Sequence, residues 1–331
     1  MKLLKKTYIL LCLLCINVAS ASHSIVFVHI GNTLPNYANV AFSQAKLFNP
    51  NCPIFILAKG TVLQQLEQEN KLNGYTGINY EDLIMTPEHK QFIENDARTD
   101  NFWRYTSERF LYLYDFIAQH NLKDVFHLEY DNMLYVNLET LLPIFQKHYP
   151  GIGATFDNDI RCIPGFVYLS NPNAAQKLAN CFMRHVSNRL NDMQIIALFK
   201  QESPSLIDHL PIITPQYIKD HTLVSLLHHI PCDKSKYMQN IDLFLSIFDA
   251  AALGQFLGGT DAIHVGGGIP GFINESCVFN PSLLSYEWIA DEKGRLIPYA
   301  IYDHTKFRIN NLHIHSKNLI SFHSLRTRSL P

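Results

Sequence analysis

Asp124-Val-Phe-His-Leu-Glu-Tyr-Asp-Asn132 is an apolar run that ends on two carboxylates. The apolar part, up to Leu128, predicts a buried strand, and carboxylates two residues apart on a strand point to the same side. At the carboxyl edge of a parallel sheet such side chains face the ligand crevice. Glu129 and Asp131 therefore suit a hard divalent cation that in turn binds a diphosphate, although this tripeptide alone also fits a solvated strand end.

The residues before this stretch follow the pattern of a nucleotide-binding α/β sheet. Ser24-Ile-Val-Phe-Val-His-Ile30 is an apolar run rich in β-branched residues, and it predicts a buried parallel strand. A loop at Gly31–Pro35, a helix over Tyr37–Phe48 and a second strand at Pro53–Ala58 follow it. This order of strand, loop, helix and strand predicts the start of the sheet.

The later segments continue with helices and strands and then become less regular. The predicted elements are a helix over Asp100–His120, a strand at Gly165–Ser170, helices over Ala174–Leu190 and Asp192–Lys200, and a helix over Asp242–Leu257. We therefore expect an α/β fold with a mostly parallel, Rossmann-like sheet flanked by helices. It forms one domain over residues 22–331, with a nucleotide-binding half at 22–170 and a less regular acceptor side at 171–331.

The first 21 residues have the features of a secretory signal peptide. Lys2, Lys5 and Lys6 precede an apolar run at Tyr8–Val18, and small residues follow at 19–21. This order of charged, apolar and small residues predicts cleavage after residue 21 and export to the medium, a periplasm or a secretory-pathway lumen. The apolar run is shorter than the ~20 residues that a membrane span needs. An uncleaved segment that anchors the chain in a membrane is the alternative.

Charge and cysteine content narrow the classes of partner and of metal site. The 27 basic and 29 acidic residues leave a net charge of −2, so nucleic acid is not an expected main partner. After signal cleavage five cysteines remain, and one stays unpaired if the others form disulfides. They are Cys52, Cys162, Cys181, Cys232 and Cys277. Their spacing includes no CxxC pair, which argues against a structural zinc site.

A second motif with metal-binding residue types lies near the end of the chain. In Leu312-His-Ile-His-Ser-Lys317, alternation places His313 and His315 on one face and the apolar residues on the other. A neutral imidazole can complete a Mn²⁺ shell begun by carboxylates, and Lys317 can neutralise phosphate. The polar face of an edge strand is the alternative, and no third ligand at the spacing of a zinc site is present.

Two further segments are candidates for sugar binding. Asp249 and Gln255 lie in an otherwise apolar, Ala-rich stretch that leads to Gly258-Gly-Thr-Asp261. A packed core helix that ends on a glycine pair explains the small residues, but not these two polar ones. The run Gly266-Gly-Gly-Ile-Pro-Gly271 lacks the spacing of a phosphate-binding loop, so a flexible loop near an acceptor site is the expectation.

Taken in order, these pieces resemble a GT-A nucleotide-sugar glycosyltransferase of the hexosyltransferase type. The match rests on the first strand, on the helix Phe102–Phe110, on Glu129-Tyr-Asp131 as the DxD motif, on the strand Gly165–Asn171 and on Leu312–Lys317. The resemblance implies a Mn²⁺ or Mg²⁺ cofactor and a nucleoside-diphosphate-sugar donor. A glycan, lipid or protein hydroxyl would be the acceptor.

The resemblance also implies a role for each matching residue. Asp131 would be the main metal ligand, Glu129 would contact the ribose or the metal through water, and His313 or His315 would be the ligand on the far side of the ion. The remaining roles would fall to Lys317 on the diphosphate, His29 and Gly31 at the base and ribose, Arg104 at the nucleotide or donor sugar, and Asp249 and Gln255 near donor and acceptor. Glu129 departs from the family pattern, which has Asp there.

The reaction itself admits two stereochemical outcomes. An inverting enzyme needs a carboxylate base that takes the acceptor's hydroxyl proton, for which Asp249 is the first candidate and Asp192 the second. A retaining enzyme needs no such base. Two other classes stay open: an exported nucleotide- or carbohydrate-binding protein with a degenerate transferase site, and a metal-dependent hydrolase that uses the same carboxylates and histidines.

Overall fold

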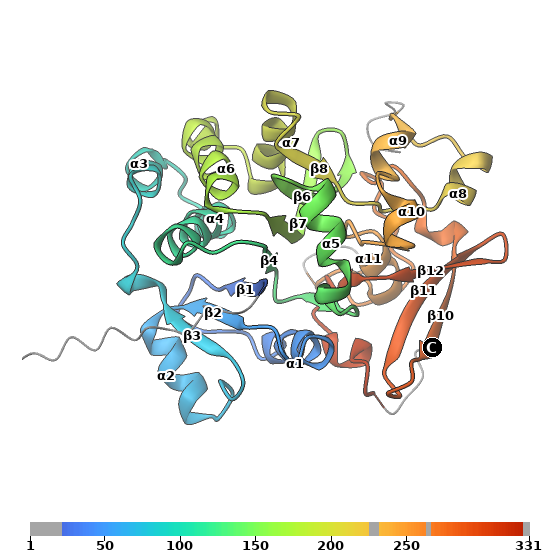
Figure 1. Cartoon of the computed structure of the whole chain (residues 1–331), viewed down its shortest axis with the longest axis horizontal. Coiled ribbons are helices and arrows are strands. Elements are labelled where there is room, and N and C mark those ends of the chain that lie inside the picture. The colour runs from blue at the N-terminus through green and yellow to red at the C-terminus, as the bar shows by residue number, and fades with distance from the viewer. Residues whose placement is uncertain (1–21, 225–231, 263–265, 327–331) are drawn as a thin grey trace, which may run out of the picture.

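The computed structural model describes residues 22–224, 232–262 and 266–326, and the predicted signal peptide lies outside them. A seven-stranded sheet forms the centre of the molecule (Figure 1). Its strands, in spatial order, are β3 (Thr76–Asn79), β2 (Ile54–Ala58), β1 (Ser24–Val28), β4 (Val125–Leu128), β7 (Arg161–Leu169), β6 (Ile152–Asn158) and β8 (Ile207–His209). Only β7 runs antiparallel to both of its neighbours, so the predicted, mostly parallel α/β sheet is confirmed.

Helices cover both faces of this sheet, as Figure 1 shows. The helices are α1 (Ala38–Phe48), α2 (Gly60–Gln68), α3 (Pro87–Asn95), α4 (Asn101–His120), α5 (Leu138–His148), α6 (Pro172–His185), α7 (Asp192–Glu202), α8 (Pro215–Asp220), α9 (Lys234–Tyr237), α10 (Ile241–Phe244) and α11 (Leu253–Gly258). Alternate residues of β1 enter different cores: Ile25 and Phe27 pack with α1, α2 and α5, whereas Val26 and Val28 pack with α4 and α6. Burial on both faces explains why β1 reads as a continuous apolar run.

The helix before the acidic motif forms as predicted. Asp100 caps α4 by accepting a hydrogen bond from the backbone N–H of Phe102 at 2.8 Å. Asn121 adopts a left-handed conformation, with φ of 50°, and ends the helix. The predicted helices at residues 37–48 and 192–200 and the predicted strands of the opening unit are also confirmed, with boundaries that differ by one or two residues.

Two predicted helices need correction. The chain from residue 242 to 257 is no single helix: α10, the short strand β9 (Ser246–Ile247) and α11 divide it. Leu245 and Ala251 have φ of 52° and 55°, and such left-handed residues end helices. The helix predicted to reach Leu190 ends at His185. A short 3₁₀ turn over Val186–Asn188 follows it, and the left-handed residue Arg189 ends that turn.

The C-terminal region carries a second sheet that the sequence analysis did not predict. It consists of β10 (Ser285–Ala290), β11 (Leu296–Tyr302), β12 (Thr305–Ile309) and β9. After β12 the chain returns to the acidic motif, where β13 (Asn311–His313) pairs antiparallel with β5 (Asn132–Leu134). This pairing brings residues 311–317 beside residues 129–131. Within the described residues, no helix is long and apolar enough to traverse a bilayer.

Candidate functional site

The two carboxylates of the acidic motif lie at the carboxyl end of β4, in the turn that leads to β5. The backbone N–H of Glu129 donates to Gly165 on β7 at 3.1 Å, and that of Asn132 donates to the carbonyl of Glu129 at 3.0 Å. These bonds hold the turn against the sheet. A cavity of about 670 Å³ opens here, with walls from β1, α4, α7, α11 and the C-terminal segment. The structure therefore places the motif at the carboxyl end of a sheet strand, on the wall of this cavity.

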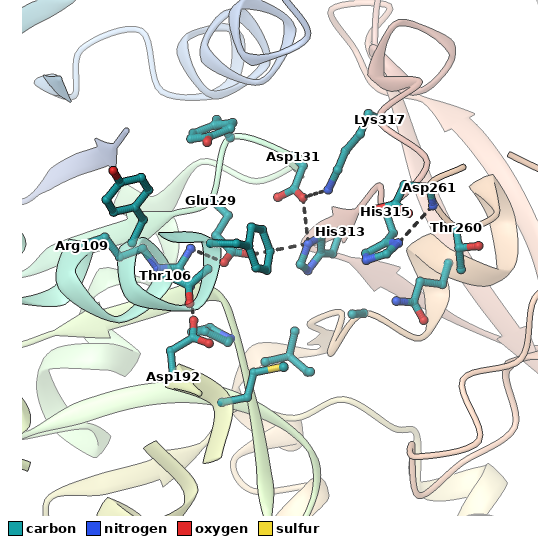
Figure 2. Close-up of a pocket in the computed structure, with 18 of the residues that line it drawn as sticks. Thr106, Arg109, Glu129, Asp131, Asp192, Thr260, Asp261, His313, His315 and Lys317 are labelled. Carbon is teal, nitrogen blue, oxygen red and sulfur yellow. Dashed lines mark hydrogen bonds and ion pairs between the residues drawn. The ribbon is translucent and has the colours of Figure 1, made fainter. Parts of the chain in front are cut away.

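Opposite charges meet around these carboxylates (Figure 2). Nε2 of His313 lies 3.2 Å from an oxygen of Asp131 and 3.4 Å from an oxygen of Glu129. Lys317 forms an ion pair with Asp131, and Arg109 forms one with Glu129. The two acidic side chains are thus surrounded by three cationic groups inside the cavity.

The pKa values of these groups reflect the same contacts. Burial opposes ionisation of Asp131, but His313 and Lys317 outweigh it and hold the pKa of Asp131 well below its usual range. Burial likewise opposes ionisation of Glu129, and Arg109 and His313 lower its pKa nonetheless. For His313, burial is again the largest effect, yet the two carboxylates raise its pKa to about 9. The site is an ionic network in which the carboxylates and the cationic groups stabilise each other's charged forms. To bind a metal ion, His313 would first lose its proton.

Glu129, Asp131 and His313 also form a candidate ligand set for one cation. One ligand atom from each lies within 4.8 Å of the others, and carboxylates with an imidazole suit a divalent ion such as Mn²⁺ or Mg²⁺. Gly165 leaves room for them, because a Cβ there would lie 2.8 Å from Nδ2 of Asn132 and 3.0 Å from Nδ1 of His313. The residues that are present therefore fit a metal ion.

Arg109 is a site residue that the sequence analysis missed. It lies on α4 between two carboxylates, bound to Glu129 and, at 2.7 Å, to Asp192. The predicted Arg104 lies one turn earlier, pairs with Glu108 at 3.3 Å and does not line the cavity. A signal for Arg109 exists in the sequence: a cation on the buried side of an amphipathic helix requires a buried anion as its partner.

Asp192 lies at the start of α7 and lines the cavity. Its carboxyl group is almost fully buried. Burial raises the pKa of Asp192 to about 6, although Arg109 acts in the opposite direction. A carboxyl group with a pKa closer to neutrality is better suited to accept a proton than one with an ordinary value.

Asp249 lies behind the cavity wall and takes part in the local framework. Its oxygens accept hydrogen bonds from four backbone N–H groups at 2.8–2.9 Å. Three of the donors belong to residues 252–254 and the fourth to His313, so Asp249 joins the start of α11 to β13. Burial raises the pKa of Asp249, and these N–H groups oppose the rise. Because all four bonds come from the backbone, the carboxylate fixes the position of His313.

Gln255 and His315 both line the cavity. Oε1 of Gln255 is buried without a hydrogen-bond partner among the described residues, and such an atom can accept from a ligand hydroxyl. The ring of His315 lies 6.3 Å from that of His313, and its Nδ1 accepts from the backbone N–H of Asp261 at 3.2 Å. Both histidines therefore face the cavity, as predicted, but only His313 lies close enough to Glu129 and Asp131 to bind the same metal ion.

The residues predicted at the base and ribose lie just outside the cavity lining. Val28 and Ile30 line it, whereas His29 between them turns away and its Nδ1 lies 3.2 Å from the hydroxyl of Tyr130. Gly31 packs against that imidazole: a Cβ on Gly31 would lie 3.2 Å from Nε2 of His29. His29 and Gly31 are therefore placed to support the wall from behind.

No family model and no curated protein matches the sequence. Solved structures match in fold over part of the chain. Mouse xyloside xylosyltransferase 1 shares 12% identity at a TM-score of 0.44, covering 60% of this chain and 90% of its own. The galactosyltransferase LgtC, solved with donor and acceptor sugar analogues, shares 13% sequence identity at a TM-score of 0.38. The match covers 59% of this chain and 77% of LgtC. A cytidylyltransferase from Leptospira borgpetersenii shares 10% sequence identity at a TM-score of 0.35, and the match covers 68% of this chain and 94% of that protein.

These similarities concern the fold. The chain resembles glycosyltransferases and a cytidylyltransferase in the arrangement of its sheet and helices. The overlaps are partial, and the case for a function rests on the residues of the cavity.

Proposed function

We propose that the protein is a metal-dependent glycosyltransferase. It would move a sugar from a nucleoside-diphosphate sugar to a hydroxyl group of a glycan, lipid or protein. The single observation that supports this most strongly is the cluster of Glu129, Asp131 and His313, whose ligand atoms lie within 4.8 Å of one another on the wall of a cavity of about 670 Å³. Lys317 beside the cluster supplies a cation for a phosphate group.

The ion pairs suggest how the site responds to a metal and a donor. Glu129, Asp131 and His313 would hold Mn²⁺ or Mg²⁺, which stabilises a departing nucleoside diphosphate as charge grows on its phosphate oxygens. Lys317 would then exchange its contact with Asp131 for one with the diphosphate. Arg109 keeps Glu129 ionised and oriented through its second contact with Asp192.

The remaining cavity residues support roles at the sugar. Gln255 offers a buried oxygen without a partner, which suits a donor-sugar hydroxyl. Of the two carboxylates considered as a base, Asp192 lines the cavity and Asp249 does not. In an inverting reaction, Asp192 would accept the acceptor's hydroxyl proton, and its pKa of about 6 favours that role. Export through residues 1–21 is part of the same proposal.

A panel of nucleotide sugars tests this function on the chain without residues 1–21. Release of nucleoside diphosphate is measured with Mn²⁺ and with EDTA, for the wild type and for Asp131→Ala. We expect Mn²⁺-dependent release that falls by at least about 100-fold in the variant, since one charged contact is worth several kcal/mol in such a site. Asp242→Ala, an exposed carboxylate on α10, is the matched control and should retain activity.

Other outcomes of the same assay favour other functions. Tight nucleotide binding without release from any donor would identify a binding protein with a degenerate transferase site. Release of free phosphate would identify a metal-dependent hydrolase. Release that persists equally in EDTA would contradict the metal dependence.

A further inference from the structure

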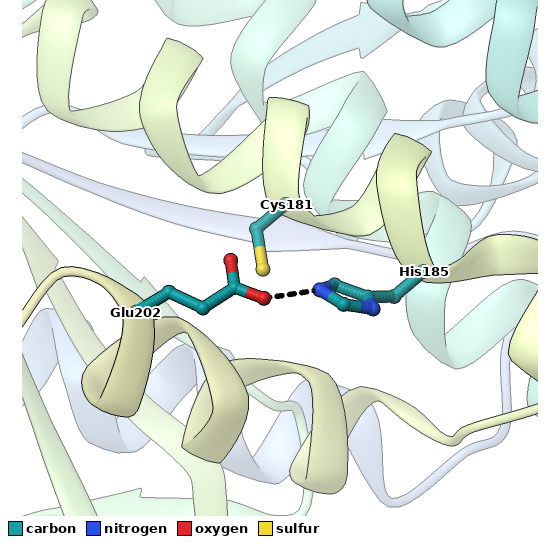
Figure 3. Close-up of side chains that lie close together, drawn as sticks. All are labelled: Cys181, His185 and Glu202. Carbon is teal, nitrogen blue, oxygen red and sulfur yellow. Dashed lines mark hydrogen bonds and ion pairs between the residues drawn. The ribbon is translucent and has the colours of Figure 1, made fainter.

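A second group of metal-binding side chains lies on the helical layer formed by α6 and α7. Cys181, His185 and Glu202 each direct a ligand atom to a common point, as Figure 3 shows, and these atoms lie within 4.8 Å of one another. Nε2 of His185 is 2.6 Å from Oε1 of Glu202. The three residues are distinct from the residues that line the cavity.

Helix geometry brings the three together. Cys181 and His185 are four residues apart on α6, so they occupy the same face, one turn from each other. Glu202 is the last residue of α7, which packs against α6. The cysteine spacings of the sequence could not indicate this arrangement, because only one cysteine takes part and the carboxylate comes from another helix.

Neighbouring groups already orient the ligand atoms. Arg184 donates to Oε2 of Glu202 at 2.6 Å and leaves Oε1 directed toward His185. The side-chain amide of Asn188 lies 3.1 Å from Nδ1 of His185. An amide can donate or accept, so rotation of Asn188 would let it accept from Nδ1–H when Nε2 binds a metal. Such outer contacts are what fix an imidazole and a carboxylate on a metal ion.

We propose that Cys181, His185 and Glu202 form a second metal site, one that takes Zn²⁺. A thiolate, an imidazole and a carboxylate suit this ion, and water would supply the fourth ligand of a tetrahedron. In such a tetrahedron the ligand atoms lie roughly 3.5 Å apart, so the side chains need to shift by only ~1 Å. A thiolate and a carboxylate together neutralise the two charges of the ion.

Burial of the three side chains suits both retention and entry of an ion. Cys181 is fully buried, while the side chains of His185 and Glu202 are 17% and 37% exposed. An ion can therefore enter from the solvent side and bind the buried sulfur last. A cysteine binds a metal ion as the thiolate, so the proton of the Cys181 thiol leaves for solvent when the metal binds. The expected consequence is proton release on binding.

The site would join α6 to α7, the helix whose first residue, Asp192, lines the cavity. Glu202 ends α7 and Asp192 begins it; these eleven residues span ~16 Å. A bound ion would fix the far end of the helix that presents Asp192 to the cavity. This role does not depend on the proposed transferase activity.

Co²⁺ in place of Zn²⁺ provides the test, because a cobalt–thiolate bond gives a near-ultraviolet charge-transfer band that oxygen and nitrogen ligands do not give. The Asp131→Ala chain is titrated so that the cavity site is disabled. We expect the band at one equivalent of Co²⁺, its displacement by Zn²⁺, and its loss in Cys181→Ser. Cys277→Ser, which alters another buried thiol, should retain the band.

Two further measurements keep the test decisive. If Cys181→Ser fails to fold, His185→Gln replaces it, since that side chain is partly exposed, and it should weaken Zn²⁺ binding at least about tenfold. In the Asp131→Ala chain, Zn²⁺ should raise the melting temperature. Absence of the band in the parent chain, its persistence in a folded Cys181→Ser chain, or unchanged Zn²⁺ affinity in His185→Gln would overturn the proposal.

Discussion

Lys317 would compete with a metal ion for Asp131, because it forms an ion pair with that carboxylate. We predict that Lys317→Met binds Mn²⁺ several-fold more tightly than the wild type when no nucleotide is present. The same variant should bind a nucleoside diphosphate about tenfold more weakly, the worth of one charge-assisted hydrogen bond. Isothermal titration measures both. Lys306→Met, which alters an exposed pair with Glu287, is the control, and weaker Mn²⁺ binding by Lys317→Met would contradict the competition.

Arg109 bridges two buried carboxylates, so its removal should affect stability as well as the site. Arg109→Ala would leave Glu129 and Asp192 without their shared cation. Breaking such a buried pair costs about 3–5 kcal/mol of unfolding free energy, which urea denaturation measures. Lys306→Ala breaks a pair that is 47% and 45% exposed, and it should cost less than about 1 kcal/mol. Equal stability of the two variants would show that the buried bridge contributes nothing.

How far the sequence predicted these residues depends on their spacing. Glu129 and Asp131 are two residues apart, and His313 and Lys317 are four apart, so each pair belongs to one short motif; the structure places all four together on the cavity wall. Arg109 was overlooked because its partners lie 20 and 83 residues away. Asp249 appeared as a lone carboxylate in an apolar segment, which pattern alone cannot distinguish from a base. Its four backbone donors exist only once α11 and β13 have met.

At the level of elements, Asp249 is the residue that joins α11 to β13. We predict that Asp249→Asn lowers the unfolding free energy by about 3 kcal/mol. The amide has only one acceptor oxygen, and its NH₂ group would face backbone N–H groups that also donate. Because the backbone of His313 is one of the four donors, Mn²⁺ affinity should fall too. Urea denaturation and metal titration measure these effects. Asp242→Asn, on the exposed side of α10, should match the wild type, and unchanged stability of Asp249→Asn would refute the assigned role.

Elements with clear periodicity and end signals were predicted well, and the others were not. The helix at residues 101–120 has a capping Asp and a left-handed Asn at its ends, and both can be read from the sequence. The Ala-rich segment after residue 242 has strong local helix propensity, but left-handed Leu245 and Ala251 and the bonds to Asp249 divide it. Strands β10 and β11 could have been found from Tyr, Trp and Ile residues on either side of the turn Asp291–Gly294.

At the scale of the whole molecule, the candidate site depends on the return of the chain to its first half. The residues of the cluster are separated by 182 positions between Asp131 and His313, and the pairing of β13 with β5 closes that distance. No local pattern specifies this pairing. It depends on the second sheet, because its strand β12 leads directly into β13. Metal binding and folding of the C-terminal segment should therefore be coupled.

The main sheet also contains a buried histidine that makes the stability of the entire fold depend on pH. His209 on β8 stacks on Phe156, with ring centroids 4.2 Å apart. Burial, with Lys200 and Lys236, lowers the pKa of His209 to about 3. Between pH 6.5 and pH 3 the unfolded chain therefore binds one more proton at this residue than the folded chain. Its contribution to stability is complete above pH 6.5 and is lost as the pH falls.

His209→Phe keeps a stacked ring and removes this titration. Below pH 6.5 we predict that the wild type loses unfolding free energy relative to the variant by about 1.4 kcal/mol per pH unit. Above pH 6.5 the difference between the two proteins should stay constant, which makes the alkaline range an internal control. Asp157 and Asp192, whose pKa values burial raises to about 6, are present in both proteins and cancel in the comparison. Urea denaturation at several pH values measures the difference, and a difference that does not change with pH would show that His209 accepts its proton equally in the folded and unfolded chain.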